Sequence, residues 1–153
     1  MKEYFECVVK FEKTMENGMV KKVSEPYIVD ALSFTEAEKR FLEYIEPFMS
    51  GEYEVKAVKR ANYSEIVSAT DEDADKWFKA KVAFITLDEK TGVEKKSSQN
   101  MLVQASDLRD AVKRFDKHME GTLADYEISA VAETAIMDVY LYKAEEKQEF
   151  KEE

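Results

Sequence analysis

The feature that most constrains the fold is a segment that occurs twice. Residues 31–41 read ALSFTEAEKRF, and residues 105–115 read ASDLRDAVKRF. The surroundings of the two copies also agree, because each copy follows two runs of alternating apolar residues and precedes a third. The sequence therefore predicts a tandem duplication of one ββαβ(β) unit.

Each repeat opens with a strand pattern in which every second residue is apolar. The positions are Phe5, Cys7, Val9 and Phe11 in the first repeat and Phe78, Ala80, Val82 and Phe84 in the second. Such alternation is typical of a strand with one buried face. A turn signal follows in both repeats: Asn17-Gly18 favours a two-residue type I′ hairpin, and DEKTG at 88–92 favours a longer turn that ends in glycine.

The repeated segment has apolar residues at helical spacing. They are Phe34, Ala37, Phe41, Ile45 and Phe48 in the first copy and Leu108, Ala111, Val112, Phe115 and Met119 in the second. Ser33 and Asp107 stand where an N-cap is expected, and Ser33 with Glu36 has capping-box spacing. The later runs NYSEIV, from Asn62, and AIMDVYLY, from Ala135, are candidates for one more strand in each repeat.

These patterns predict an α+β fold, with antiparallel sheet and one helix per repeat and a pseudo-twofold relation between the repeats. We expect one compact domain over 1–142, in which repeat one is 3–67, an acidic linker is 68–76 and repeat two is 77–142. A charged tail follows at 143–153. A repeat of about 60 residues would be marginal alone, so we expect the two repeats to share a core.

The net charge of −10 is unevenly distributed, because the acids concentrate in the linker and the tail. The linker contains DEDAD at 71–75. We interpret it as solvated chain, or as the acidic first turn of a helix after Thr70. A calcium loop is the alternative, but Lys76 and Val82 stand where an EF-hand loop has glycine and glutamate.

The rest of the composition favours a cytoplasmic protein without membrane contact. The only cysteine, Cys7, cannot form an internal disulfide, and no apolar run approaches the ~18 residues of a membrane span. The only histidine, His118, has no nucleophile placed near it by a recognisable motif, and Cys7 alternates with residues of an inward strand face. We therefore expect no enzymatic activity, no cofactor and no metal.

Basic pairs occur at matching places in both repeats. They are candidate contacts to a partner or to phosphates, and comprise Lys21, Lys22, Lys39, Arg40, Lys95, Lys96, Lys113 and Arg114. Lys56, Lys59 and Arg60 could extend one such patch, and Tyr4, Tyr63 and Trp77 are candidates for stacking on bases. The alternative is that these lysines and arginines are ordinary solvent-facing residues, since acids lie beside them.

Several stretches together resemble a known family. They are EPYIVDALSFTEAE, KRANYSEI, KWFKAKVAFITLDEKTGVEKK, MLVQASDLRDAVKR and VAETAIMDV. The chain is similar over about residues 1–140 to an uncharacterised domain-of-unknown-function family of small proteins from Bacteroidales genomes, their phages and mobile elements. The resemblance implies an intracellular bacterial or phage setting and brings no assigned activity or site residue.

Two hypotheses on function follow. The first is a non-enzymatic protein-interaction module, because the chain has duplicated exposed basic pairs and lacks a recognisable catalytic set. The alternative is a nucleic-acid-binding protein that uses the same lysines and arginines, whose affinity would fall steeply with salt.

Overall fold

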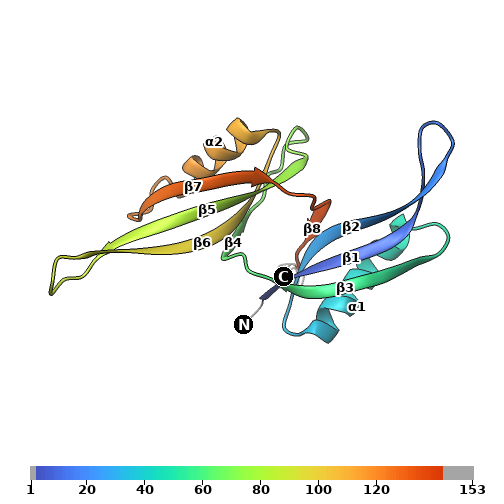
Figure 1. Ribbon diagram of the computed structural model, residues 1–153, viewed down its shortest axis with the longest axis horizontal. Coiled ribbons are helices and arrows are strands. Elements are labelled where there is room, and N and C mark those ends of the chain that lie inside the picture. The colour runs from blue at the N-terminus through green and yellow to red at the C-terminus, as the bar shows by residue number, and fades with distance from the viewer. Residues whose placement is uncertain (1–2, 143–153) are drawn as a thin grey trace, which may run out of the picture. The chain divides into compact units, whose positions relative to one another are not determined.

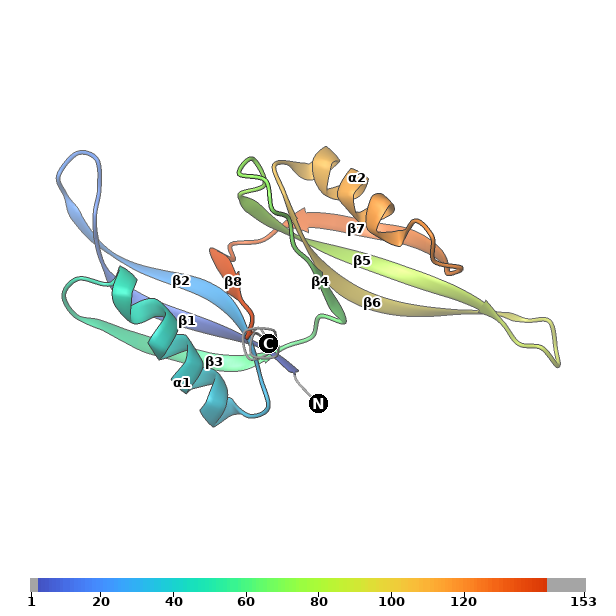
Figure 2. The same cartoon turned by 180° about the vertical axis from the view of Figure 1, so that it is seen from behind.

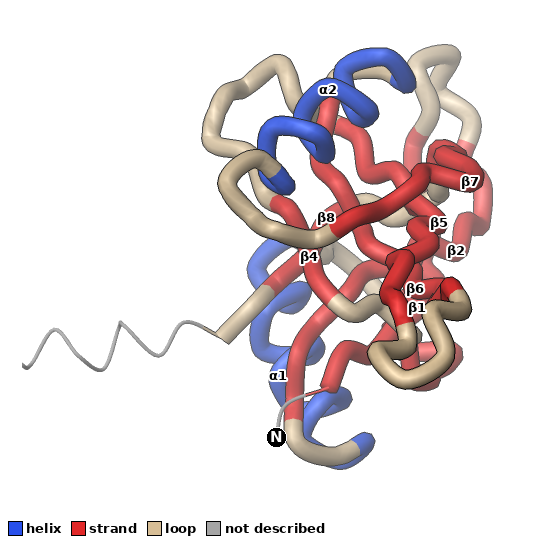
Figure 3. Tube along the Cα trace, turned by 90° about the vertical axis from the view of Figure 1, so that its left-hand side faces the viewer, coloured by secondary structure: helices blue, strands red, loops and turns tan. Residues whose placement is uncertain are grey.

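The computed structural model describes residues 3–142, which form two compact units. Within this range, unit 1 contains residues 3–61 and 136–142, and unit 2 contains residues 62–135. Both units combine one sheet with one long helix (Figures 1 and 2). Figure 3 shows that strands make up most of the trace. The α+β class predicted from the sequence is confirmed.

Unit 1 contains a four-stranded sheet in the order β3-β1-β2-β8. Its elements are β1 (Glu3–Thr14), β2 (Val20–Ala31), α1 (Phe34–Ile45), a 3₁₀ turn (Glu46–Phe48), β3 (Tyr53–Ala61) and β8 (Asp138–Tyr140). Strand β1 is antiparallel to both β2 and β3, whereas the short β8 is parallel to β2. The sheet is therefore mainly antiparallel, as expected from the hairpin signals.

Unit 2 contains a four-stranded sheet in the order β4-β6-β5-β7. Its elements are β4 (Glu65–Val67), β5 (Lys76–Leu87), β6 (Glu94–Ala105), α2 (Leu108–Met119) and β7 (Asp125–Glu133). Strand β5 is antiparallel to β6 and β7, and β4 is parallel to β6. Each long strand or helix of unit 2 has the same length as its counterpart in unit 1.

The core of each unit lies between the helix and the adjacent face of the sheet. In unit 1, the alternating residues of β1 are buried against Ala37, Phe41 and Ile45 of α1. In unit 2, the corresponding cluster includes Val82 and Phe115. The predicted inward faces are confirmed from the second turn of each helix to its last residue, whereas the first residues Phe34 and Leu108, and Phe48 of the 3₁₀ turn, are exposed. A helix of three turns cannot cover the whole sheet.

The helix starts follow the sequence closely. The Ser33 side chain accepts a hydrogen bond from the Glu36 N–H (3.1 Å), and the Asp107 carboxylate accepts one from the Asp110 N–H (2.8 Å). Both N-caps predicted from the sequence are confirmed. Capping satisfies amide groups that have no partner within the helix.

The two short strands do form, but each pairs outside the repeat that it follows in sequence. Strand β4 follows β3 and pairs with β6 of unit 2, whereas β8 follows β7 and pairs with β2 of unit 1. The repeat boundaries 3–67 and 77–142 therefore differ from those of the two units. Apolar periodicity identifies a strand but not the sheet edge that it joins. The single domain over 1–142 stays a prediction, and the predicted tail lies outside the described residues.

The first hairpin turn differs from the prediction. A type I′ turn needs positive φ at both central residues, but only Gly18 has positive φ (85°) in this turn. The loop is longer: the Met15 N–H donates to the Met19 carbonyl (2.7 Å), and the Asn17 side chain accepts from the Met19 N–H (3.0 Å). The second turn ends, as predicted, in a glycine with positive φ, Gly92 (73°).

Candidate functional site

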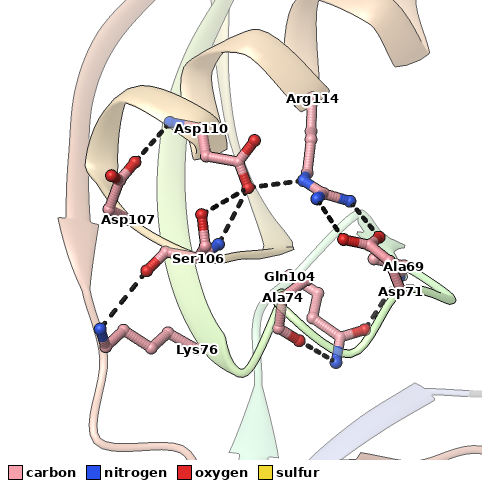
Figure 4. Close-up of polar contacts among 9 residues, drawn as sticks. All are labelled: Ala69, Asp71, Ala74, Lys76, Gln104, Ser106, Asp107, Asp110 and Arg114. Carbon is pink, nitrogen blue, oxygen red and sulfur yellow. Dashed lines mark hydrogen bonds and ion pairs between the residues drawn. The ribbon is translucent and has the colours of Figure 1, made fainter.

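A polar network in unit 2 connects the start of α2 to the acidic segment 68–76 (Figure 4). The Asp110 carboxylate accepts hydrogen bonds from the Ser106 N–H (2.9 Å) and from Nε of Arg114 (2.7 Å). The other two guanidinium nitrogens of Arg114 donate to both carboxylate oxygens of Asp71 (2.9 and 2.8 Å). A two-point contact of this kind fixes orientation as well as distance.

The electrostatics of this network follow from its hydrogen bonds. The bond from Arg114 lowers the pKa of Asp71, and the bonds from Ser106 and Arg114 lower the pKa of Asp110. In turn, the two carboxylates raise the pKa of the Arg114 guanidinium. All three groups are therefore charged at neutral pH, and the network is an ion-pair structure.

The acidic segment packs against unit 2 through its backbone and through Ala74, while its acids are exposed. Gln104 of β6 accepts a hydrogen bond from the Ala69 N–H (2.8 Å) and donates one to the Ala74 carbonyl (3.0 Å), as Figure 4 shows. Ala74 is buried. No helix forms after Thr70, because residues 71–75 adopt turns and irregular backbone. Of the four acids of DEDAD, Asp71 pairs with Arg114 of α2, and all four side chains are exposed.

A second contact in unit 2 joins α2 to β4. His118 lies within 2.8 Å of the Glu65 carboxylate, through Nε2 of the imidazole. His118 lies near the end of its helix and is partly exposed, as predicted. Its position gives it a structural contact to the first residue of β4.

Unit 1 has a corresponding network that is more deeply buried. Arg40 of α1 donates hydrogen bonds to the Asp30 carboxylate (2.6 Å) and to the Asp30 carbonyl. The same carboxylate accepts from the Tyr142 N–H (2.8 Å), and the guanidinium lies over the rings of Tyr142 (4.7 Å) and Tyr140 (5.4 Å). Asp30 is buried, so its charge would be costly without this pairing.

Tyr44 joins α1 to β8 in the way that His118 joins α2 to β4. Its hydroxyl donates to the Asp138 carboxylate (2.9 Å), and its ring stacks on Tyr140 with centroids 4.5 Å apart. Burial and the nearby Asp138 raise the pKa of Tyr44. Asp138 is the first residue of β8, as Glu65 is the first residue of β4.

We call these two networks latches, because each fastens a three-residue strand to a sheet edge. The unit 1 latch comprises Asp30, Arg40, Tyr44, Asp138 and Tyr142, and the unit 2 latch comprises Glu65, Asp71, Asp110, Arg114 and His118. The latches were not predicted from the sequence, in which Arg40 and Arg114 were candidates for partner contacts or for ordinary solvent-facing residues. A comparison of the two copies could have found them, because each places a polar side chain four residues after the arginine.

The predicted site residues fall into two groups. Six lysines are exposed: Lys21, Lys22, Lys39, Lys95, Lys96 and Lys113. Lys96 forms an ion pair with Glu127 (3.3 Å). The two arginines, Arg40 and Arg114, form ion pairs within the latches. The arginines therefore lie in internal networks, and the lysines lie on the surface. Contact with a partner stays a prediction for all eight residues.

Two of the remaining candidates, Cys7 and Trp77, are buried. Cys7 is buried in the core of unit 1, and burial raises the pKa of its thiol to about 12. Trp77 is buried, so it is not exposed for stacking. Within residues 3–142, no group of three or more His, Cys, Asp or Glu side chains is arranged to hold a metal ion. No helix in this range has the length and apolar character that crossing a membrane requires.

Unit 1 also has an open groove of about 880 Å³ where its strands extend beyond α1. Its lining includes the charged side chains Lys10, Glu12, Lys22 and Glu54. The mixture of charges gives the groove no clear preference for an anion or a cation.

Comparison with known proteins identifies one family. A family model described as "Domain of unknown function (DUF4494)" matches residues 3–142. No curated protein matches the chain.

Proposed function

The chain belongs to the DUF4494 family, whose function is unknown, and we propose that it is a non-enzymatic protein-interaction module. The observation that carries the proposal is the pair of hairpin arms. We define arm 1 as residues 12–22 and arm 2 as residues 86–96. In each arm, exposed apolar side chains lie next to a lysine pair.

The arms extend beyond the strands that flank them. Strand β3 pairs with β1 only as far as Phe11, and β7 pairs with β5 only as far as Ile85. Figure 1 shows that both hairpins run on past the helices of their units. The arms are therefore two-stranded ribbons that bury little of their own apolar surface.

Several apolar residues on the arms are exposed. Met19 and Leu87 each have 65% of their surface accessible, and Val20 and Val93 are also exposed. Lys21 and Lys22 follow Val20 directly, and Lys95 and Lys96 follow Val93 after Glu94. Apolar residues rimmed by charge mark protein-interaction surfaces more often than catalytic ones, and the lysines favour a partner with acidic groups. This supports an interaction module over an enzyme.

We extend the proposal to how the chain arose and to its biological setting. We infer that the two units arose by duplication of one ββαβ(β) unit and keep a pseudo-twofold relation. The matched element lengths, N-caps and arginine positions support this inference. We also propose a cytoplasmic setting in a bacterium, phage or mobile element, which rests on the sequence resemblance to proteins of Bacteroidales and their phages.

The test is affinity capture with the full chain from a lysate of its host, divided into nuclease-treated and untreated halves. The test variant is K21A/K22A/K95A/K96A, and the matched control K56A/K79A/K81A/K117A removes four exposed lysines outside the arms. We expect a protein partner that survives nuclease and binds the control variant but not the arm variant.

Two outcomes would contradict this proposal. Equal capture by both variants would show that the arms are not the contact surface. Recovery of nucleic acid, with all proteins lost on nuclease treatment, would instead favour the nucleic-acid alternative. In that case, the affinity would fall steeply as the salt concentration rises.

A further inference from the structure

The sheet edges of the two units differ in how they are protected against strand addition. An exposed edge presents unpaired N–H and C=O groups, which proteins block by bulges, proline, charge or short length. The edges formed by β3 and β7 each lie beside a register shift, between Val8 and Val9 and between Lys81 and Val82. Strands β4 and β8 are short, at three residues each.

The remaining edge in each unit is the part of β2 or β6 that its short strand leaves uncovered. In unit 1 the Met137 N–H donates to the Pro26 carbonyl (2.9 Å), so the uncovered part is Val20–Glu25, and its inner half ends in the charged Glu25. In unit 2 the corresponding residue is Asn100, and the uncovered part is Glu94–Gln99. We call Glu94–Gln99 the β6 open edge. Its inner half, Ser97–Gln99, carries neither proline nor charge.

The direction of the backbone groups on this edge can be worked out from the hydrogen bonds. The Ser64 N–H donates to the Asn100 carbonyl (2.8 Å), so the backbone of Asn100 faces away from β5. The pairing of β5 with β6 is regular from Glu94 to Ala105. Because the direction alternates along a strand, the N–H and C=O groups of Ser98 and Lys96 also face outward.

The side chains of the open edge leave these groups accessible. Ser97, Ser98 and Gln99 are small or flexible and exposed, and Lys95 and Lys96 are exposed beside them. Strand β4 already occupies the next part of the same edge, along Met101–Val103. A further strand would continue the line of β4, and carboxylates on it would lie close to the lysines.

We propose that the β6 open edge binds an extended peptide segment of the partner by strand addition, with acidic side chains placed beside Lys95 and Lys96. This inference rests on the proposed function and specifies its contact in unit 2. Main-chain hydrogen bonds provide the affinity in this mode, and side chains along the edge select the sequence.

The test uses the full chain to select peptides from a displayed library of random linear peptides. The key variant is Ser98→Pro, which removes an outward N–H without removing a bond to β5. Ser98→Ala is its matched control, since it keeps the N–H. Ser24→Pro, at the corresponding position of β2, controls for the cost of a proline on an exposed strand. Peptide affinity is measured by fluorescence anisotropy.

We expect enriched peptides to be acidic and to lose about tenfold or more in affinity with Ser98→Pro, but less than about twofold with Ser98→Ala or Ser24→Pro. Amide exchange on the unchanged chain should show new protection at the N–H groups of Lys96 and Ser98. Since this measurement needs no variant, it decides the question even where Ser98→Pro fails to fold.

Failure to enrich any peptide, equal binding to Ser98→Pro, or protection elsewhere would each overturn the inference. If the chain captures a protein partner through its arms but shows none of these edge effects, the strand-addition inference is wrong and the proposed function stands. If the unchanged chain captures no protein partner, both the proposed function and the strand-addition inference are wrong.

Discussion

The two latches use an arginine from the same helix position in different surroundings. Arg40 and Arg114 each directly precede the buried phenylalanine of their helix. The Arg40 side chain is 11% exposed and pairs with a buried carboxylate, whereas Arg114 is 27% exposed and pairs with Asp71 at the surface. The same local sequence, KRF, therefore produces one buried and one partly solvated ion pair.

The two ion pairs differ in burial because the carboxylate that pairs with the arginine comes from a different element in each unit. In unit 1 the acid is Asp30, which directly precedes the alanine that ends β2. The corresponding residue of β6 is Gln104, which binds the acidic segment through its amide group. Unit 2 therefore places its acids on α2 and on a loop, which lie closer to solvent. A buried pair is costly to break and a solvated pair is not.

The largest expected effect comes from removing the two arginines. Arg40→Ala leaves Asp30 as a buried carboxylate without its guanidinium, which we expect to cost about 3–5 kcal/mol in the free energy of unfolding. Arg114→Ala should cost about 1 kcal/mol, because water can solvate Asp71 and Asp110. Urea unfolding followed by circular dichroism measures both values.

Two probes show which unit loses stability in each arginine variant. Exchange of the Tyr142 amide, which donates to Asp30, reports on unit 1. The fluorescence of Trp77, the only tryptophan, reports on unit 2. Arg40→Ala should speed exchange at Tyr142. Equal losses for the two variants would contradict the distinction between a buried and a solvated latch.

The next effect concerns the contacts to the short strands. Tyr44→Phe removes the hydroxyl that donates to Asp138 in a half-buried site, and we expect a loss of about 1–2 kcal/mol. His118→Gln should cost less than about 1 kcal/mol, because the His118–Glu65 contact is more exposed. Urea unfolding of the two variants gives the comparison. A larger loss for His118→Gln would show that exposure does not rank these contacts.

Acid should loosen the unit 2 latch. The pKa values of Asp71 and Asp110 lie below the ordinary value of 3.8, so their charged forms stabilise the folded state. This contribution is complete above the ordinary pKa and is lost as the pH falls through the lowered folded pKa. The protection of the Ser106 amide against exchange, relative to the intrinsic exchange rate at each pH, should fall below about pH 4.

The matched control for the acid prediction is Asp71→Asn, which removes one titrating carboxylate from the latch. This variant should be less stable at neutral pH and lose less of its stability on acidification. An unchanged acid transition would show that Asp71 does not contribute to it.

The fold was largely predictable because its signals are local. The alternation along β1 and β5, the helical spacing and the caps at Ser33 and Asp107 each depend on residues close in sequence. The placement of β4 and β8 was not predictable, since a three-residue strand has no pattern that selects its partner. The pairing of Arg114 with Asp71 was missed because the two residues are distant in sequence.

The smallest expected effect separates the latch arginines from the lysines beside them. Lys39 and Lys113 directly precede Arg40 and Arg114, but both are exposed, and no ion pair involves them among residues 3–142. Lys39→Ala and Lys113→Ala should therefore change the free energy of unfolding by less than about 0.5 kcal/mol. Urea unfolding beside the arginine variants makes the comparison direct. A loss above 1 kcal/mol for either lysine would mean that the basic pair acts as a unit and that the arginine alone does not define the latch.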